Sequence, residues 1–337
     1  MAAAPDAAAD VAAAQTLVPD DAPEDSDASS LATADSASLA SSILAYEYEN
    51  GRRYQRKDQY FLPNDEGEQE RLDLMHHIFL LTLGGRLYEA PILEGGKTPK
   101  RILDLGTGTG SWATQIADEI PEAEVVGVDL SPIQSSWVPP NVKFYVDDIE
   151  SPWTYGPDES FDYIHQRALS GSIKDWPALF KQAFAHTRPG GWYEAQEYPI
   201  EVTSDDGTHV KAENVNEWCK NVVAACDQQG RPIAITRSLK GWMEDAGFVD
   251  VHEAEYKVPL SPWPKDPRLK EIGRYYLVQS FEAAESFILQ LYTKVLGKPM
   301  DETRSFIDKV RAEIADRNLH IYAPYRFVWG RKPEASS

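Results

Sequence analysis

The segment 104–110, with the sequence Asp-Leu-Gly-Thr-Gly-Thr-Gly, has the composition of a ligand-binding loop. Its three glycines, Gly106, Gly108 and Gly110, allow positive φ angles and let a ligand approach the backbone closely. The helix expected after them offers N–H groups that have no partner within the helix. Asp104 lies two residues before the first glycine, where its carboxylate can bind the amino group of a methionine moiety.

Two further acids end predicted strands and extend this loop into a nucleoside site. Asp129 closes the second strand, where it can accept hydrogen bonds from both hydroxyls of a ribose, and Leu130 follows it. Asp148 follows the third strand and can accept the amino group of an adenine, whose ring face Ile149 can cover. The pair Asp148 and Ile149 also fits a solvated turn with a buried isoleucine, so both interpretations stay open.

The glycine loop alone does not separate methyltransferases from NAD-dependent oxidoreductases, which also bind their cofactor at such a loop. The spacing here is Gly-x-Gly-x-Gly, and Ser111 stands where the dinucleotide fingerprint has its third glycine. Together with the acid before the loop, this spacing favours a methyltransferase that uses S-adenosylmethionine. A dehydrogenase remains the remote alternative.

Methyl transfer from a sulfonium is an in-line displacement, in which the protein mainly aligns donor and acceptor. A base is needed only where the acceptor must lose a proton. His165 is the first candidate, because it should emerge at the rim of the crevice; Glu197 is the second and His209 a third. A histidine at a strand end is more often structural. Tyr54 and Tyr60 can contact the sulfonium by cation–π interaction, or simply pack against an N-terminal helix.

The elements that must position these residues alternate between strand and helix from residue 100 onward. Val125, Val126 and Val128 suit a strand that is buried on both faces. The predicted strands are 101–105, 124–129, 142–146, 161–165, 192–198, 248–258 and 322–330, and the predicted helices are 65–83, 111–119, 176–187 and 236–246. This alternation predicts a mostly parallel, doubly wound α/β sheet of seven strands.

Other segments stand outside this alternation. Residues 1–40 hold fifteen alanines, eight acids and no lysine or arginine, so we expect a disordered acidic tail. We expect an N-terminal helical cap in 41–98 and a methyltransferase domain in 99–337. Helical insertions at about 208–235 and 267–317 interrupt that domain, where a lid or a partner surface could form.

Charge and composition exclude several classes of partner. The chain has 54 acids against 33 lysines and arginines, a net charge of -21. Such a surface repels phosphate backbones and anionic membranes, so we expect a small-molecule acceptor and neither nucleic acid nor membrane. Cys219 and Cys226 are too few for a disulfide framework, and we expect a cytoplasmic protein. His76 and His77 lack the i, i+4 spacing of helical ligands, so no metal is expected.

The chain resembles the fungal LaeA-like methyltransferases over residues 46–265. The likeness lies in the glycine loop, in Asp-Leu-Ser-Pro-Ile-Gln from Asp129, in Trp-Val-Pro-Pro-Asn from Trp137 and in Pro-Gly-Gly-Trp before Tyr193. Asn-Gly-Arg-Arg-Tyr, which ends at Tyr54, and Leu-Pro-Asn-Asp-Glu, which ends at Glu66, also match. The combination is specific, although no single motif is.

The resemblance implies a class I methyltransferase (Rossmann-like) fold, with S-adenosylmethionine as methyl donor and S-adenosylhomocysteine as product. By position it assigns Asp104 and the three glycines to the first cofactor motif, Asp129 to the ribose, and Asp148 with Ile149 to the adenine. Tyr54 falls in an N-terminal motif that can fold over the cofactor.

The chain departs from the family pattern at Ala195, where relatives often carry a histidine, so a base at that position cannot be assumed. The family holds pathway enzymes that methylate small natural products and nuclear regulators related to LaeA. The first role implies O-methylation of a small molecule in fungal secondary metabolism, and the second implies protein partners and the nucleus. The sequence leaves the acceptor and a homodimer open.

Overall fold

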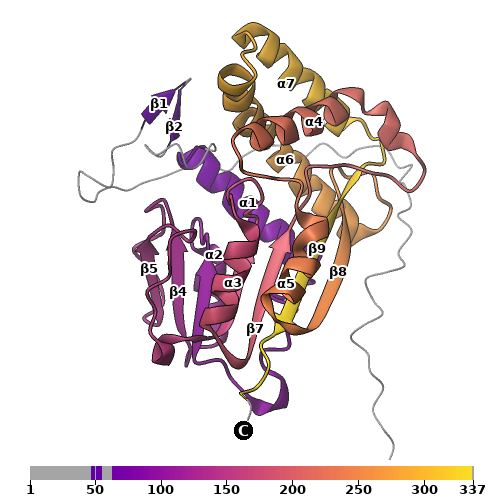
Figure 1. Ribbon diagram of the computed structural model, residues 1–337. Coiled ribbons are helices and arrows are strands. Elements are labelled where there is room, and N and C mark those ends of the chain that lie inside the picture. The colour runs from indigo at the N-terminus through magenta and orange to yellow at the C-terminus, as the bar shows by residue number, and fades with distance from the viewer. Residues whose placement is uncertain (1–46, 50, 55–62, 336–337) are drawn as a thin grey trace, which may run out of the picture.

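A seven-stranded sheet forms the centre of the molecule, with the strand order β5-β4-β3-β6-β7-β9-β8 (Figure 1). The computed structural model describes residues 47–49, 51–54 and 63–335, so Tyr60 and the predicted tail at 1–40 lie outside the described residues. In chain order the strands are β3 (Arg101–Leu105), β4 (Glu124–Asp129), β5 (Val142–Val146), β6 (Phe161–Arg167), β7 (Thr187–Glu197), β8 (Val249–Pro259) and β9 (Tyr322–Arg331). The predicted doubly wound, seven-stranded sheet is confirmed.

Strand direction changes only at β9, the last strand in sequence. β3 to β7 pair in parallel, and β9 runs antiparallel to both neighbours, β7 and β8. The chain winds outward from β3 through β4 to β5 and then returns to the other side of β3 with β6. The order therefore reverses between β3 and β6, and such a switch point leaves a crevice at the carboxyl ends of parallel strands.

Two predicted boundaries differ from the structure for local reasons. β6 continues to Arg167, two residues beyond the predicted end at His165, because it keeps pairing with β7 as far as Gln196. β7 begins at Thr187 rather than at 192, because the stretch with Gly190 and Gly191 forms an irregularity within the strand instead of a turn before it.

Helices cover both faces of the sheet because strand side chains alternate between the faces. Leu103 and Leu105 of β3 pack against α3 (Trp176–His186). Ile102 of the same strand packs on the opposite face against α2 (Ser111–Glu119). The predicted helix at 236–246 is divided in the structure into the 3-10 turn η4 (Thr236–Ser238) and the helix α5 (Leu239–Ala246). Helix α5 packs on the same face of the sheet as α3.

The helix α1 (Glu66–Thr82) precedes the sheet and packs against α6 (Pro267–Gln290). Its first turn is capped by Asp65, whose carboxylate accepts the N–H of Glu68 at 3.0 Å. Arg52 forms an ion pair with the same carboxylate at 2.6 Å. Arg52 belongs to a two-stranded antiparallel hairpin, so the cap residue joins this hairpin to α1. The hairpin consists of β1 (Glu47–Glu49) and β2 (Arg52–Tyr54).

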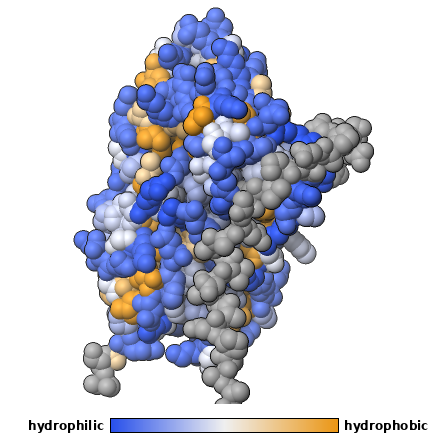
Figure 2. Space-filling model, turned by 90° about the vertical axis from the view of Figure 1, so that its right-hand side faces the viewer, coloured by the Kyte–Doolittle hydropathy of each residue, from blue (hydrophilic) through white to orange (hydrophobic). Residues whose placement is uncertain are grey.

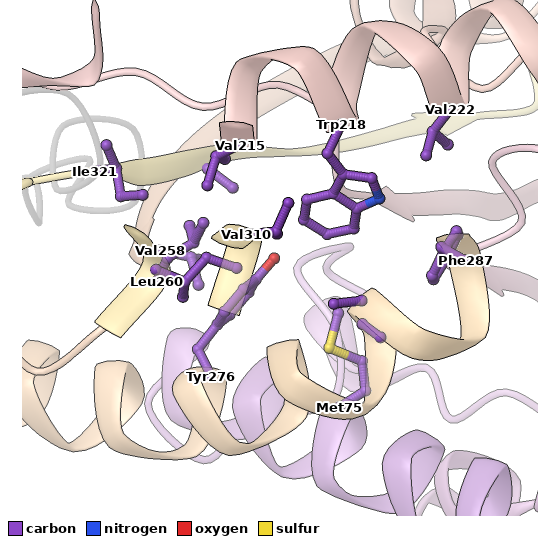
Figure 3. Close-up of a cluster of buried hydrophobic side chains, with 14 of the residues drawn as sticks. Met75, Val215, Trp218, Val222, Val258, Leu260, Tyr276, Phe287, Val310 and Ile321 are labelled. Atoms are coloured by element: carbon purple, nitrogen blue, oxygen red, sulfur yellow. The ribbon is translucent and has the colours of Figure 1, made fainter. Parts of the chain in front are cut away.

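A helical layer lies beyond the carboxyl ends of the strands (Figure 1). It contains α4 (Glu213–Gln228), α6 and α7 (Met300–Ala315). Figure 3 shows how these helices meet: Trp218 of α4, Tyr276 of α6 and Met75 of α1 converge on one buried cluster. Because α1 shares that cluster, the helical layer and the N-terminal helix form one continuous core above the sheet.

Two connections at one side of the sheet contain no α-helix. Residues 130–141 join β4 to β5 as a loop, and residues 147–160 join β5 to β6 with only the short turn η2 (Pro157–Glu159). The sheet face beside β5 is therefore covered by loops, which leaves room for a cleft. The face in Figure 2 is mostly hydrophilic, with small separate hydrophobic areas. None of the described helices is long and apolar enough to cross a bilayer.

Gly273 provides a test of the packing between α6 and the segment after β8. A Cβ atom at Gly273 would clash with the backbone carbonyl of Ser261, which cannot move aside as a side chain can. We expect Gly273→Ala to lower the free energy of unfolding by about 1–3 kcal/mol. Gly241 of α5 has nothing within 4 Å of such an atom, so Gly241→Ala should leave stability unchanged or raise it by up to about 1 kcal/mol. Urea denaturation of both variants measures the difference; equal stabilities would show that α6 does not approach Ser261 this closely.

Candidate active site

The glycine loop between β3 and α2 requires glycine for both conformation and space. Gly106, Gly108 and Gly110 have φ angles of 64°, 58° and 83°, values that favour glycine strongly. A Cβ atom at Gly106 would clash with Leu169, and one at Gly110 would lie 2.5 Å from the ring of Phe144. The loop therefore lies tightly between β6 and β5, with its backbone at the switch point of the sheet.

Asp129 fastens this loop to the end of β4. One carboxylate oxygen accepts the N–H of Gly108 at 2.8 Å, and the other accepts the N–H of Ser131 at 2.9 Å. Burial raises the pKa of Asp129 to about 6, although both hydrogen bonds favour the ionised form. A carboxylate has about four acceptor positions, so besides these two N–H groups and that of Leu130 at least one position remains for a hydroxyl donor. Leu130, beside it, is partly exposed.

Asp104 lies at the inner side of the loop and is held from two directions. Thr107 Oγ1 donates to one carboxylate oxygen at 2.6 Å, and the other oxygen lies 2.8 Å from His165 Nδ1. Only 3% of the Asp104 surface is exposed. The sequence prediction that Asp104 and Asp129 flank one loop agrees with these contacts, and their roles toward a ligand remain to be tested.

His165 does not emerge at the rim, and that prediction is wrong. Its side chain has no exposed surface, and its ring stacks on Trp112 with centroids 3.7 Å apart and an interplanar angle of 5°. Trp112 in turn donates its indole N–H to the carbonyl of Leu87. His165 is thus enclosed among core groups, where it orients Asp104 and cannot meet an acceptor.

Glu197 is also enclosed rather than open to a substrate. Its carboxylate accepts N–H groups of Leu169 and Ser170 at 2.9 and 3.1 Å and the hydroxyl of Ser170 at 2.8 Å. These bonds stabilise the turn after β6, in which Ala168 has a φ of 58°, a left-handed conformation that costs a non-glycine residue energy. Burial raises the pKa of Glu197 to about 7. Glu197 therefore stabilises a strained turn, and the catalytic role predicted for it has no geometric support.

The other predicted residues are dispersed. His209 lies in the 3-10 turn η3 (Thr208–Lys211), where its Nδ1 is 2.9 Å from Ser204 Oγ. Tyr54 is buried at the end of β2. Within the described residues, no group of three or more side chains that could bind a metal gathers at His76, at His77 or elsewhere.

Asp148 and Ile149 line a cleft of about 270 Å³ beside β5. The loop of residues 147–160, which joins β5 to β6 without an α-helix, forms one side of this cleft. Trp153 donates its indole N–H to the carbonyl of Ile149 at 2.9 Å, which fixes the loop over the cleft. Most of the lining is apolar or aromatic. It includes Leu105, Val128, Tyr145, Ile149, Trp153 and Tyr155. A flat apolar ring fits this lining, with Asp148 at its polar edge.

A second, small cavity of about 30 Å³ lies between the sheet and the helical layer. Tyr198 and Tyr276 line it together with Trp218, Gln279 and Phe287. The indole nitrogen of Trp218 is buried and has no hydrogen-bond partner among the described residues. An unsatisfied buried donor is costly, and the residue that carries this one also lines the cavity.

Sequence reasoning missed two side chains that border the loop. Asp73 of α1 accepts hydrogen bonds from Thr109 and Ser111 at 2.6 and 2.7 Å, which joins α1 to the glycine loop. Arg167 ends β6 and lies with Nη2 2.8 Å from His76 Nδ1. Asp73 could have been identified from its position in a predicted helix with polar groups on one face. Arg167 could not, because the predicted strand ended before it.

The raised pKa of Glu197 predicts a pH-dependent contribution to stability. Because the folded protein binds this proton more tightly than an unfolded glutamate of pKa 4.5 does, the contribution is complete below about pH 4.5 and is lost as the pH rises to about 7. The shift corresponds to a change on the order of 3 kcal/mol. Urea denaturation between pH 4.5 and 8 should show a decrease that is weaker in Glu197→Gln.

The same substitution at the exposed Glu201, Glu201→Gln, is the control and should follow the wild-type pH profile. A profile of Glu197→Gln that matches the wild type would show that the Glu197 carboxyl does not titrate in this range.

Comparison with known proteins gives the family. A family model described as a methyltransferase domain matches residues 46–253. Methyltransferase pytC of Aspergillus terreus is 42% identical over 313 residues, 92% of this chain and 95% of that protein. The secondary metabolism regulator laeA of Monascus pilosus is 37% identical over 289 residues, 85% of this chain and 77% of that protein.

Solved structures are more distant in sequence. Phosphoethanolamine N-methyltransferase 2 of Haemonchus contortus, in complex with S-adenosyl-L-methionine, is 20% identical with a TM-score of 0.43, over 82% of this chain and 55% of that chain. The domain match and the high identity to fungal relatives over nearly the whole chain decide the matter: this chain belongs to the LaeA-like family of class I, S-adenosylmethionine-dependent methyltransferases.

Proposed function

We propose that the chain methylates an oxygen atom of a small molecule in fungal secondary metabolism, with S-adenosylmethionine held at the glycine loop. The observation that carries the proposal is the pair of carboxylates around that loop. Asp129 keeps an acceptor position beside the N–H of Gly108, and Asp104 accepts the hydroxyl of Thr107 in the same loop. The first fits two ribose hydroxyls, and the second fits an ammonium group.

The remaining parts of the cofactor also find matching surroundings. The cleft with Asp148 and Ile149 offers apolar faces for a purine and a carboxylate for its amino group. When bound, S-adenosylmethionine supplies a methyl group that its sulfonium has already activated. The protein has to bind both reactants, align them and exclude water.

The acceptor enters, in this proposal, through the space under the helical layer. The aromatic lining from Tyr198, Trp218 and Tyr276 suits a mainly apolar molecule, and the indole N–H of Trp218 can donate to an oxygen on it. The cavity is small, so in this proposal α4 or α6 has to move for an acceptor to enter. Buried His165 and Glu197 do not supply a base, which favours an acceptor that ionises readily, such as a phenol or a carboxylic acid.

A regulatory function is the second candidate, supported by the name of the Monascus pilosus relative. One surface feature also fits a protein partner: Trp137, in the loop that follows β4, is 93% exposed, and exposed tryptophan is typical of binding hot spots. In that case the protein acts with partners in the nucleus. As a pathway enzyme, it works in the cytoplasm as a monomer or homodimer.

Thermal unfolding with candidate cofactors tests the cofactor site. S-adenosylhomocysteine at 100 times its Kd should stabilise the protein by about 2.7 kcal/mol, and NAD should not stabilise it. Asp129→Asn should weaken S-adenosylhomocysteine binding by about tenfold or more, because a charge-assisted acceptor of two hydroxyls is lost. Asp227→Asn, the same change at an exposed position of α4, is the control. Stabilisation by NAD alone would refute the proposed cofactor.

Transfer of a labelled methyl group tests the acceptor class. Incubation of the protein and labelled S-adenosylmethionine with metabolite extracts of a producing fungus should yield a labelled small molecule. Trp218→Phe keeps the aromatic ring but removes its N–H, so we expect a higher KM for that acceptor, by about three- to tenfold, and unchanged affinity for S-adenosylhomocysteine. Label that appears only in protein, with none in metabolites, would favour the regulatory function instead.

A further inference from the structure

Arg167 is a charged side chain that has no charged partner among the described residues. Its guanidinium lies over the ring of Phe79, 4.8 Å from the centroid, and its Nη2 is 2.8 Å from His76 Nδ1. No carboxylate of the described residues lies within ion-pair distance of it. Burial lowers the pKa of Arg167 to about 10, which the negative charge of Asp104 only partly offsets. The group still carries its full charge at physiological pH.

The two fully buried arginines among the described residues are paired with acids, whereas Arg167 is half-buried. Arg71 lies 2.6 Å from Glu68, and Arg231 lies 3.3 Å from Glu150. Leaving a desolvated cation without a counter-charge costs several kcal/mol. Arg167, at the carboxyl end of a central strand, lacks such a counter-charge. This indicates that an anion from outside the chain binds its guanidinium.

His76 orients the guanidinium without neutralising it. Burial, together with the charge of Arg167, lowers the pKa of His76 to about 3, so the imidazole is neutral. Its Nδ1 then accepts one N–H of Arg167, and the other donors of the guanidinium fork remain for a ligand. A carboxylate in place of His76 would neutralise the guanidinium. The neutral imidazole orients the side chain and leaves its positive charge available to a ligand.

The strand register places Arg167 beside Asp104. Asp104 of β3 pairs directly with His165 of β6, and Arg167 follows two residues later on the same face of the sheet. Asp104 and Arg167 do not form an ion pair with each other, since the ion-pair partner of Asp104 is His165. The acid and the cation therefore lie near each other at the carboxyl ends of neighbouring strands, without forming an ion pair.

We propose that Asp104 and Arg167 together bind the zwitterionic end of an α-amino acid, namely the methionine end of the cofactor, with Arg167 on its carboxylate. The inference rests on the proposed function, because it takes the cofactor to be S-adenosylmethionine. An α-amino acid carries its ammonium and its carboxylate on one carbon, so it can bridge two opposite charges that do not touch. The planar guanidinium binds a carboxylate with two parallel hydrogen bonds.

Calorimetric titration with two ligands tests this assignment. S-adenosylhomocysteine has the carboxylate, and its decarboxylated analogue lacks only that group. Wild type should bind S-adenosylhomocysteine about 10- to 100-fold more tightly than the analogue. The Arg167→Gln variant should bind S-adenosylhomocysteine more weakly than wild type does and the decarboxylated analogue equally well, so that the preference disappears. Arg167→Lys, which keeps the charge but not the fork, should fall between the two.

Arg188→Gln is the matched control, because Arg188 pairs with Asp162 near the opposite end of β6; it should bind both ligands as wild type does. If Arg167→Gln does not fold, the wild-type protein still provides a test. Its affinity for S-adenosylhomocysteine is then compared with its affinity for the decarboxylated analogue and for the methyl ester of S-adenosylhomocysteine. Equal affinity of wild type for the acid and the decarboxylated analogue overturns the inference, as does undiminished binding by Arg167→Gln; both leave the proposed function intact. A wild-type protein that does not bind S-adenosylhomocysteine at all overturns both.

Discussion

The hydrogen bonds from Asp129 and Asp104 to the loop between β3 and α2 are the constraint on which the rest of the site depends. Three glycines with positive φ form a loop that has no regular hydrogen-bond ladder of its own. Asp129 binds its middle through the N–H of Gly108, and Asp104 binds its start through the hydroxyl of Thr107. The conformation that admits a ligand is therefore held by the same carboxylates that we propose meet the ligand, so any change to either acid alters both shape and affinity.

Behind these acids lies a second set of buried polar groups that keeps them in place. His165 holds Asp104 and stacks on Trp112, which donates to the carbonyl of Leu87. Glu194 of β7 accepts the N–H groups of Glu89 and Ala90, so the segment after α1 is fixed to the sheet at two neighbouring points. The helix over the site and the floor of the site are thus connected through the core, and α1 can cover the loop only while this support persists.

Much of the fold and the outline of the site could be predicted from the sequence, because short apolar strands and a glycine loop are local patterns. Asp104 and Asp129 were identifiable from their distance to the glycines and from their places at strand ends. The acid–base candidates were not, because exposure depends on which segments pack above a residue: His165 lies beneath α2, and Glu197 faces a strained turn after β6. Identifying Arg167 required both the true length of β6 and the knowledge that α1 places His76, and none of its acids, beside the guanidinium. Neither can be derived from local spacing.

The position of β9 has a consequence for the order in which the protein can assemble. β8 ends at residue 259, but it reaches the sheet only through β9, which begins at residue 322 and inserts between β7 and β8. During synthesis, β7 therefore presents an unpaired edge until two long helices have been added to the chain. Contacts between segments so far apart form slowly, and an exposed strand edge can associate with other chains. A nascent chain that halts within α6 or α7 would leave an open sheet edge beneath the acceptor space, so chaperone protection is most needed in that interval.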